Sequence, residues 1–530
     1  MKIFDKQIWR PTGLLVLVLV LAGAIAYWVY GGDIHWSGYI TMMCFYVAMF
    51  LVGAYAATRN SAADTAGVLL AGRALPLWIA AGTMGATWVD GGYLNGTAEY
   101  TATAGLVWVQ APWGYAFSLI LGGLFFARPM RRRRFFTMID PLEQRFGKRM
   151  GAVLFLPALC GEIFWTAAIL TALGTTFGTV IGLETTPAII LSALIAITYT
   201  ALGGLWAVAL TDVVQMALLI IGLYLVVPFV LESTGGIGHT LESYSQNMGK
   251  GASFWPSAEF LGDYYWVWWD SALLLMLGGI PWQVYFQRVL ASKDERTAVR
   301  LSIFAGLICF VAAAPAVLIG IAGNVADWEA LGTTAPPTGS ATLPWAIRYL
   351  TNPWVAVIGL GAVAAAVMSS VDSSILSASS MAVWNVFRPL FRPEISNEGL
   401  SRSIGKAIWI IGVAATLLAL KITSVYQLWF LCSDFVYCLL FPALVCALFD
   451  PKANFPGALS GFLVAFILRF GGGEPTLGIP ALIPYPSAPD GAVLFPYKTL
   501  AMLSGLVVIM AVSRLTQHSH PTRPLSTVEE

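Results

Sequence analysis

Residues 81–100 of this chain read AGTMGATWVDGGYLNGTAEY and lie within an apolar run that is long enough to cross a bilayer. Trp88 and Asp90 are followed in the middle of that run by Gly91 and Gly92, and paired glycines weaken a helix. Irregular backbone at membrane depth is tolerated only where it lines a cavity or is buried in protein, and an ionisable residue there indicates a functional site. The stretch therefore fits either a broken helix at a binding site or a glycine-rich packing helix whose Asp90 faces a hydrated loop.

The composition places the chain in a lipid bilayer. Of the 530 residues, 58% are hydrophobic and only 11% are charged, whereas soluble proteins carry about 25% charged residues. The mean hydropathy is +0.75. We therefore expect an all-α integral membrane protein. The net charge of +1 gives no sign of a nucleic-acid partner, and the six cysteines lie in apolar runs, as buried free thiols do.

Apolar runs of about 20 residues predict about fourteen transmembrane helices. The predicted spans are residues 12–31, 37–58, 77–104, 107–127, 151–180, 186–203, 207–231, 264–289, 301–324, 351–381, 405–421, 425–449, 455–470 and 496–513. The longer connections at 232–263, 325–350 and 471–495 all fall on one side and are expected to cap an extracytoplasmic opening.

Basic residues predict the orientation of the spans. If the spans alternate in direction, the basic clusters fall on one side of the membrane, which positive residues mark as the cytoplasm. These clusters are Lys2, Lys6 and Arg10 before the first span, Arg128 and Arg131 to Arg134 after the fourth, Lys293, Arg296 and Arg300 after the eighth, and Arg388, Arg392, Arg402 and Lys406 after the tenth. An even number of spans then places both termini in the cytoplasm. We expect the polar tail after Ser513 to be disordered.

A second interrupted span lies at residues 264–290, YYWVWWDSALLLMLGGIPWQVYFQRVL. Gly278, Gly279 and Pro281 break the helix directly before Trp282, because proline removes a backbone donor and clashes with the preceding turn. The two interrupted spans are the third and the eighth, five apart and therefore opposite in direction. This spacing predicts two inverted repeats of five spans with the substrate site at the two breaks, although independent glycines would give the same pattern.

The predicted spans divide the chain into seven segments. They are an N-terminal cytoplasmic segment with an additional helix (1–36), a pre-core helix and cytoplasmic loop (37–76), the first repeat (77–231), an extracytoplasmic loop (232–263), the second repeat (264–449), C-terminal helices (450–513) and a cytoplasmic tail (514–530).

Four aromatic residues near the breaks suggest a site for an organic cation. Trp88 and Trp282 stand at the breaks, Trp165 lies on the fifth span and Tyr115 on the fourth. A cation over an aromatic ring gains about 0.5–2 kcal/mol, and quaternary ammonium groups are the usual ligands of aromatic cages. With 20 tryptophans in the chain, any single one is more often an interfacial anchor or a packing residue.

Oxygen-bearing residues on the tenth span suggest a sodium site. Ser369, Ser370, Asp372 and Ser373 follow Ala366 closely, and the carbonyl groups of a broken helix, around Gly85 and Trp88, are suited to complete a sodium shell. Asp212, at the start of the seventh span, adds a carboxylate. The alternative is that these serines bond their own helix and favour close helix packing.

Two further polar residues flank the second break. Asp270 follows a Trp-Trp pair on the broken eighth span, and Gln283 follows Trp282. We include both, with Asp90, among the candidate substrate-binding residues. For Asp270 a structural role as a bonded carboxylate is an open alternative.

These residues stand in blocks that resemble the sodium/solute symporter family, and most closely its high-affinity choline transporters. The blocks are GGYLNGTAEY, WVQAPWGYAFSLILGGLFFARPMR, TMIDPLEQRFGKRMG, ALTDVVQ, LLLMLGGIPWQVYFQRVL, GLGAVAAAVMSSVDSSILSASSM and GGEPTLGIP. The resemblance covers roughly residues 37–513. It implies a LeuT-like fold of five plus five helices, sodium as the coupling ion and, for the choline branch, dependence on chloride.

The resemblance also assigns residues. It implies a choline cage of Trp88, Tyr115, Trp165 and Trp282. It further implies one sodium site at Gly85, Trp88, Ala366, Ser369 and Ser370, and a second, where present, at Asp212, Ser369, Asp372 and Ser373. For a bacterial homologue, the expected location is the inner membrane.

Two features depart from the family pattern. An additional span at 12–31 precedes the matched region, and Asp90 stands where the choline transporters have glycine. A carboxylate at this position would strengthen cation binding, select a different cation, or bind a proton or another ion.

We therefore expect a sodium-coupled symporter that imports choline or a related quaternary ammonium compound, and not an enzyme. A sodium symporter for another solute, such as a betaine, an amino acid or another amine, is the alternative. A zwitterion needs an anchor for its carboxylate, and neither break carries an arginine or lysine. A lipid-modifying enzyme would need a His/Asp cluster near one face, which the sequence does not offer.

Overall fold

The computed structural model describes residues 6–30, 36–57, 65–202, 205–422, 425–489 and 491–528. Over these residues the secondary structure is helical, and extended pairing is limited to isolated bridges, which confirms the all-α class. Eight of the described helices are long and apolar enough to cross a membrane.

Helix is present in each apolar range singled out above. The main helices are α1 (Lys6–Tyr30), α2 (Trp36–Ala57), α4 (Leu77–Trp88), α5 (Gly91–Thr103), α6 (Ala111–Leu121), α9 (Lys148–Ile181), α10 (Thr185–Leu202), α11 (Leu205–Ser233), α14 (Tyr265–Gly278), α15 (Gln283–Ala291), α16 (Glu295–Val325), α18 (Pro353–Ala382), α20 (Asn397–Ala419), α21 (Val425–Phe435), α22 (Phe441–Phe449), α23 (Phe455–Gly471) and α24 (Tyr497–Leu515). Shorter helices in the connections include α7 (Arg128–Arg132), α8 (Asp140–Phe146), α12 (Ile237–Met248), α13 (Ala258–Leu261), α17 (Thr342–Tyr349) and α19 (Arg388–Phe391).

Both predicted helix breaks are confirmed. Helix α4 ends at Trp88, and α5 begins at Gly91 after a non-helical Val89 and Asp90. Helix α14 ends at Gly278, and α15 begins after Trp282, whose backbone is extended. Glycine at position 91 also allows close packing, because a Cβ there would lie only 2.6 Å from the Cβ of Ala172.

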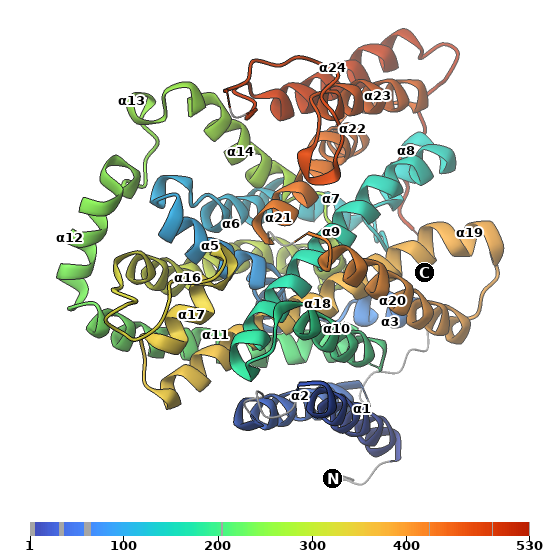
Figure 1. The fold of residues 1–530 in the computed structure, drawn as a ribbon. Helices are drawn as coiled ribbons and strands as arrows, with labels where there is room; N and C mark the ends of the chain where they lie inside the picture. Colours follow the sequence, from blue (N-terminus) through green and yellow to red (C-terminus); the bar gives the residue numbers. More distant parts are fainter. Residues whose placement is uncertain are drawn as a thin grey trace.

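The two broken helices lie in the centre of the molecule, between two peripheral helix pairs. Helices α4 and α15 contact each other, and α18 packs against both of them. In Figure 1 the pair α1–α2 forms one edge of the molecule and the pair α23–α24 forms the opposite edge, while α12 and α13 lie at a third side. Helix α9 bridges the centre, since it packs against α18 and α21.

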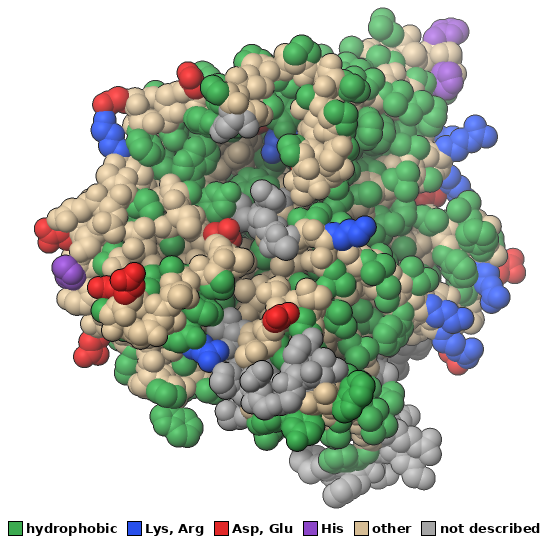
Figure 2. Space-filling model, viewed as in Figure 1, with side chains coloured by type: hydrophobic (Ala, Val, Ile, Leu, Met, Phe, Trp, Pro, Cys, Tyr) green, Lys and Arg blue, Asp and Glu red, His purple; other side chains and the backbone are tan. Residues whose placement is uncertain are grey.

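Charged side chains are unevenly distributed on the surface. Figure 2 shows most of the visible Lys and Arg side chains on the side where Figure 1 shows α8 and α19, whereas Asp and Glu gather on the side of α12 and α13. The C-terminal tail lies on the basic side. Val528 donates its backbone N–H to the carbonyl of Arg133 at 3.0 Å, and Arg145 donates to the carbonyl of Arg523 at 2.9 Å. The described part of the tail is therefore bonded to the protein, contrary to the expectation of disorder.

Buried charges join α21 to the C-terminal helix pair. Arg469 on α23 contacts both Asp434 on α21 and Glu474, each at 2.5 Å, and Lys498 on α24 lies 3.3 Å from Asp434. The side chains of Arg469 and Asp434 are each only 1% exposed. Because a buried charge without its partner is strongly destabilising, this network holds α21 in place.

We predict that Arg469→Ala lowers the free energy of unfolding by about 3–5 kcal/mol, because it leaves Asp434 buried without its main partner. The matched control is Arg402→Ala, which removes an ion pair with Glu398 whose side chains are 71% and 77% exposed, and which should change stability by about 0–1 kcal/mol. Thermal unfolding of both variants in detergent measures the difference. Equal midpoints for the two variants would contradict the structural role of the network.

Candidate substrate and ion site

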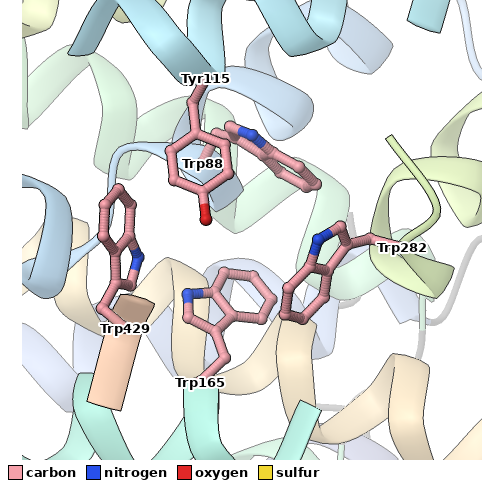
Figure 3. A pocket seen from close by; sticks show the side chains of 5 residues that line it. All are labelled: Trp88, Tyr115, Trp165, Trp282 and Trp429. Carbon is pink, nitrogen blue, oxygen red and sulfur yellow. The ribbon is translucent and has the colours of Figure 1, made fainter. Parts of the chain in front are cut away.

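Five aromatic side chains surround a central pocket. Figure 3 shows Trp88, Tyr115, Trp165, Trp282 and Trp429 around one space, into which the hydroxyl group of Tyr115 points. The space between these side chains that no atom fills is about 260 Å³. The five side chains are only 2–5% exposed, so the pocket lies inside the protein.

The rings contact one another around the pocket. Trp88 lies 6.2 Å from Tyr115 and 6.1 Å from Trp165, measured between ring centroids. Trp165 lies 5.5 Å from Trp282, and Tyr115 lies 4.5 Å from Trp429. Four separate helices and the second break thus contribute one ring each, and the structure brings together all four aromatic residues that the sequence singled out.

Hydrogen bonds fix several of these side chains. Trp282 donates its indole N–H to the carbonyl oxygen of Gly278 at 2.7 Å, across the break that separates α14 from α15. The hydroxyl group of Tyr115 pairs with that of Ser433 on α21. The indole nitrogen of Trp88 has no partner among the described residues.

Trp429 is the member of the pocket that sequence reasoning missed. It lies on α21, in a regular apolar stretch without a glycine or proline break. The only nearby signal is the polar pair Ser433 and Asp434, one helical turn further on. That pair would have marked α21 as a helix that faces the protein interior.

Asp90 lies behind the aromatic rings, fully buried at the start of α5. One carboxylate oxygen accepts the backbone N–H of Tyr93 at 2.5 Å, and the other accepts the indole N–H of Trp165. The indole ring of Trp429 lies beside the same carboxylate, since a Cβ at Gly92 would be 3.0 Å from Cδ1 of Trp429 and 3.2 Å from Oδ1 of Asp90. Asp90 therefore contacts two walls of the pocket without being one of the residues that line it.

The structure places Asp270 and Gln283 outside the pocket. Asp270 accepts hydrogen bonds from the backbone N–H groups of Lys498 and Thr499, so it joins α14 to α24. The side-chain oxygen of Gln283 accepts the N–H of Met138 at 2.8 Å, so it joins α15 to the segment before α8. Both side chains thus have bonding partners away from the aromatic rings.

The serines of α18 lie against the end of α4. Ser369 donates to the carbonyl oxygen of Ala86 at 3.0 Å, and Ser370 donates to that of Thr87, also at 3.0 Å. Both serines also contact the carbonyl oxygen of Ala366, at 2.7 and 3.2 Å. Residues 85–88 and 366–370 are therefore next to each other, and their carbonyl and hydroxyl oxygens form a cluster of hard ligands.

A second cluster of oxygens surrounds Asp212. Its carboxylate accepts a hydrogen bond from Thr83 on α4 and one of 3.4 Å from Ser373 on α18. Arg288 on α15, which sequence reasoning did not include, bonds to Ser373 and lies 3.6 Å from Asp212. Both oxygens of the buried Asp372 are without a well-formed hydrogen bond to the described residues. The cluster around Asp212 thus contains one cationic side chain, that of Arg288.

Comparison with known proteins identifies the family. The model of the sodium:solute symporter family matches residues 68–465. The human high affinity choline transporter 1 is 44% identical over 503 residues, which cover 91% of this chain and 86% of the relative. The high-affinity choline transporter 1 of Drosophila melanogaster is 43% identical over 498 residues and covers 91% of this chain and 79% of the relative.

Solved structures support the same fold. A sodium-coupled sialic acid symporter, determined in a substrate-bound outward-open state, aligns with a TM-score of 0.77 over 90% of this chain and 97% of that chain, at 20% identity. The fold is therefore that of the LeuT-type sodium symporters, and the chain is an integral membrane protein. By its sequence and its fold, this chain belongs to the sodium:solute symporter family.

Proposed function

We propose that this symporter imports choline, or a closely related quaternary ammonium compound, together with sodium. The observation that carries the proposal is the buried pocket lined by four tryptophans and a tyrosine, without a lysine or arginine among the lining residues. The similarity to choline transporters of animals supports it.

The chemistry of the pocket fits a trimethylammonium group. Such a group cannot donate a hydrogen bond, so its binding depends on the electron-rich faces of aromatic rings, each worth about 0.5–2 kcal/mol. Several rings together supply enough free energy for tight binding without any buried ion pair. A zwitterionic substrate would leave its carboxylate without a cationic partner among the five lining side chains.

Sodium is proposed to bind where α18 meets the end of α4. The ligands of the first site are the carbonyl oxygens of Gly85, Trp88 and Ala366 and the hydroxyl oxygens of Ser369 and Ser370. The hydrogen bonds from these serines to the carbonyl oxygens of Ala86 and Thr87 support this assignment, because they hold the two hydroxyl groups against the stretch of α4 that lies between Gly85 and Trp88. This site lies beside the helix break that carries Trp88, so sodium occupancy and the shape of the pocket are linked.

A second sodium site is proposed at Asp212, Asp372 and Ser373, with Ser369 nearby. Sodium at this position would share Asp212 and Ser373 with the guanidinium group of Arg288. Thr83 offers a further oxygen, since it already contacts Asp212.

We propose fourteen membrane-spanning helices, with residues 77–231 and 264–449 as the two inverted repeats. Both termini are proposed to be cytoplasmic, in the inner membrane of a bacterium. The bonding of the tail to Arg133, within the most basic connection, supports a cytoplasmic C-terminus. Chloride is a proposed co-substrate on the basis of the choline-transporter resemblance alone.

Alternating access would couple the two gradients. One sodium ion that moves down an about tenfold gradient supplies about 1.4 kcal/mol. A membrane potential of about 100 mV adds about 2.3 kcal/mol per charge, and the positive substrate also gains from this potential. One sodium ion is thus sufficient to concentrate a neutral solute by about several hundred-fold, and a cation further.

The decisive test of the function is uptake of labelled choline into vesicles that contain the purified protein. Uptake is expected to require an inward sodium gradient and to be inhibited by unlabelled choline more strongly than by betaine, because the pocket offers no partner for a carboxylate. Acetylcholine serves as a second competitor with the same head group. Uptake that does not depend on sodium would refute the proposal. Stronger inhibition by betaine than by choline would indicate that betaine is the substrate.

Removing one wall of the pocket is expected to weaken choline binding. Trp88→Ala and Trp282→Ala should each raise the Kd of choline about tenfold or more, since each removes one aromatic face. Trp354→Ala, which alters a tryptophan that is 82% exposed, is the matched control and should leave the Kd unchanged. Binding of labelled choline at saturating sodium provides the measurement. Unchanged affinity in both pocket variants would exclude the cage.

The serines of α18 are expected to affect sodium more than choline. Ser369→Ala and Ser370→Ala should each raise the sodium concentration for half-maximal uptake about tenfold, because each removes one oxygen ligand. Ser379→Ala is the control, since this serine is buried on the same helix and its hydroxyl group has no hydrogen-bond partner among the described residues. If the control and the two variants show the same sodium dependence, the proposed first site is wrong.

A further inference from the structure

Asp90 is a buried carboxylate beside the aromatic pocket, and the structure shows what surrounds it. The carboxylate is fully buried at the first helix break, directly before Gly91 and Gly92. Its hydrogen-bond donors are N–H groups, namely the backbone N–H of Tyr93 and the indole N–H of Trp165, and the indole ring of Trp429 lies beside it. An ionised carboxylate is an acceptor only, so this set of donors suits the charged form.

The position of Gly92 explains how Trp429 reaches this carboxylate. A Cβ at position 92 would lie 3.0 Å from Cδ1 of Trp429 and 3.2 Å from Oδ1 of Asp90. The indole ring and the carboxylate therefore meet beside a residue that has no side chain. Trp429 therefore approaches Asp90 with the side of its ring that carries Cδ1, and the same ring is a wall of the pocket.

Such bonds orient an aromatic ring for binding a cation. The edge of an aromatic ring is positive and its face is negative. The N–H edge of Trp165 is bound to the carboxylate of Asp90, so this positive edge is already paired with a negative group and is not free to face a cation. The negative charge of the carboxylate also lies close to the pocket, separated from it by the rings that it orients.

We propose that Asp90 is a positioning residue that sets the selectivity of the pocket for a cation over a neutral molecule of the same shape, through the indole groups of Trp165 and Trp429. The inference rests on the proposed function, because it requires that the pocket binds the substrate cation. It assigns Asp90 a role distinct from direct ligation, since Asp90 is not a lining residue.

The test compares choline with its neutral isostere, in which a quaternary carbon replaces the nitrogen. Both dissociation constants are measured in the purified protein at saturating sodium, the isostere by competition. In Asp90→Gly and Asp90→Asn, the Kd of choline should rise about tenfold, because a hydrogen-bonded charged group is removed, while the Kd of the isostere should change less than about threefold. Glycine at a helix N-cap costs little, so the first variant is expected to fold.

A second set of variants tests whether Asp90 acts through Trp165. Trp165→Phe keeps an aromatic ring but removes the N–H. It should therefore lower the preference for choline over the neutral isostere, as the Asp90 variants do. Combined with Asp90→Gly it should add little, because coupled residues are not additive. Asp270→Asn, which alters another buried carboxylate outside the pocket, should leave the ratio unchanged.

Each outcome separates the two hypotheses. If the unaltered protein fails to bind choline, the proposed function is wrong. If it binds choline and the Asp90 variants weaken both ligands in parallel, or neither, Asp90 has a purely structural role and the inference is overturned. Additive effects of the Asp90 and Trp165 substitutions would likewise refute the route through Trp165.

Discussion

The centre of the fold depends on hydrogen bonds to the backbone N–H and C=O groups at two helix breaks, which lie in an apolar medium. A broken helix frees N–H and C=O groups that water cannot reach at this depth. At the first break, the α4 carbonyl groups accept hydrogen bonds from serines of α18, and Asp90 accepts the N–H of Tyr93. At the second break, the side chain of Trp282 itself bonds the carbonyl of Gly278. The groups that complete the broken backbone are thus the same groups that form the pocket and the oxygen clusters.

Because the same groups serve both purposes, polar and aromatic residues lie close together in the centre of the molecule. The oxygen cluster around Ser369 and the ring of Trp88 share one short stretch of α4, so changes at either affect the other. The cluster around Asp212 reaches the second break through Arg288, which lies on α15 only six residues after Trp282. Both broken helices are therefore connected to α18 by hydrogen bonds, and α18 is the element on which their positions converge.

Much of this arrangement could be predicted because its causes are local. Glycine pairs and Pro281 mark the breaks, and the run from Ser369 to Ser373 marks the oxygen-rich helix. The remainder depends on which faces meet after folding. Trp429 lies in an unbroken apolar helix, and the packing of α21 against α9, α14 and α5 directs it into the pocket. Asp270 and Gln283 are close to the second break in sequence, yet their helices direct them to Thr499 and Met138.

The bond from Trp282 to Gly278 gives the pocket a mechanical property. The residue that forms one wall follows the break, whereas the carbonyl group that holds its ring precedes it. The indole ring of Trp282 therefore connects the two sides of the helix break through one hydrogen bond. If α14 tilted relative to α15, this hydrogen bond would either rotate the ring of Trp282 with the break or be lost. In both cases one wall of the aromatic pocket would move. A bend between α14 and α15 would then open the aromatic pocket through the same movement of the main chain.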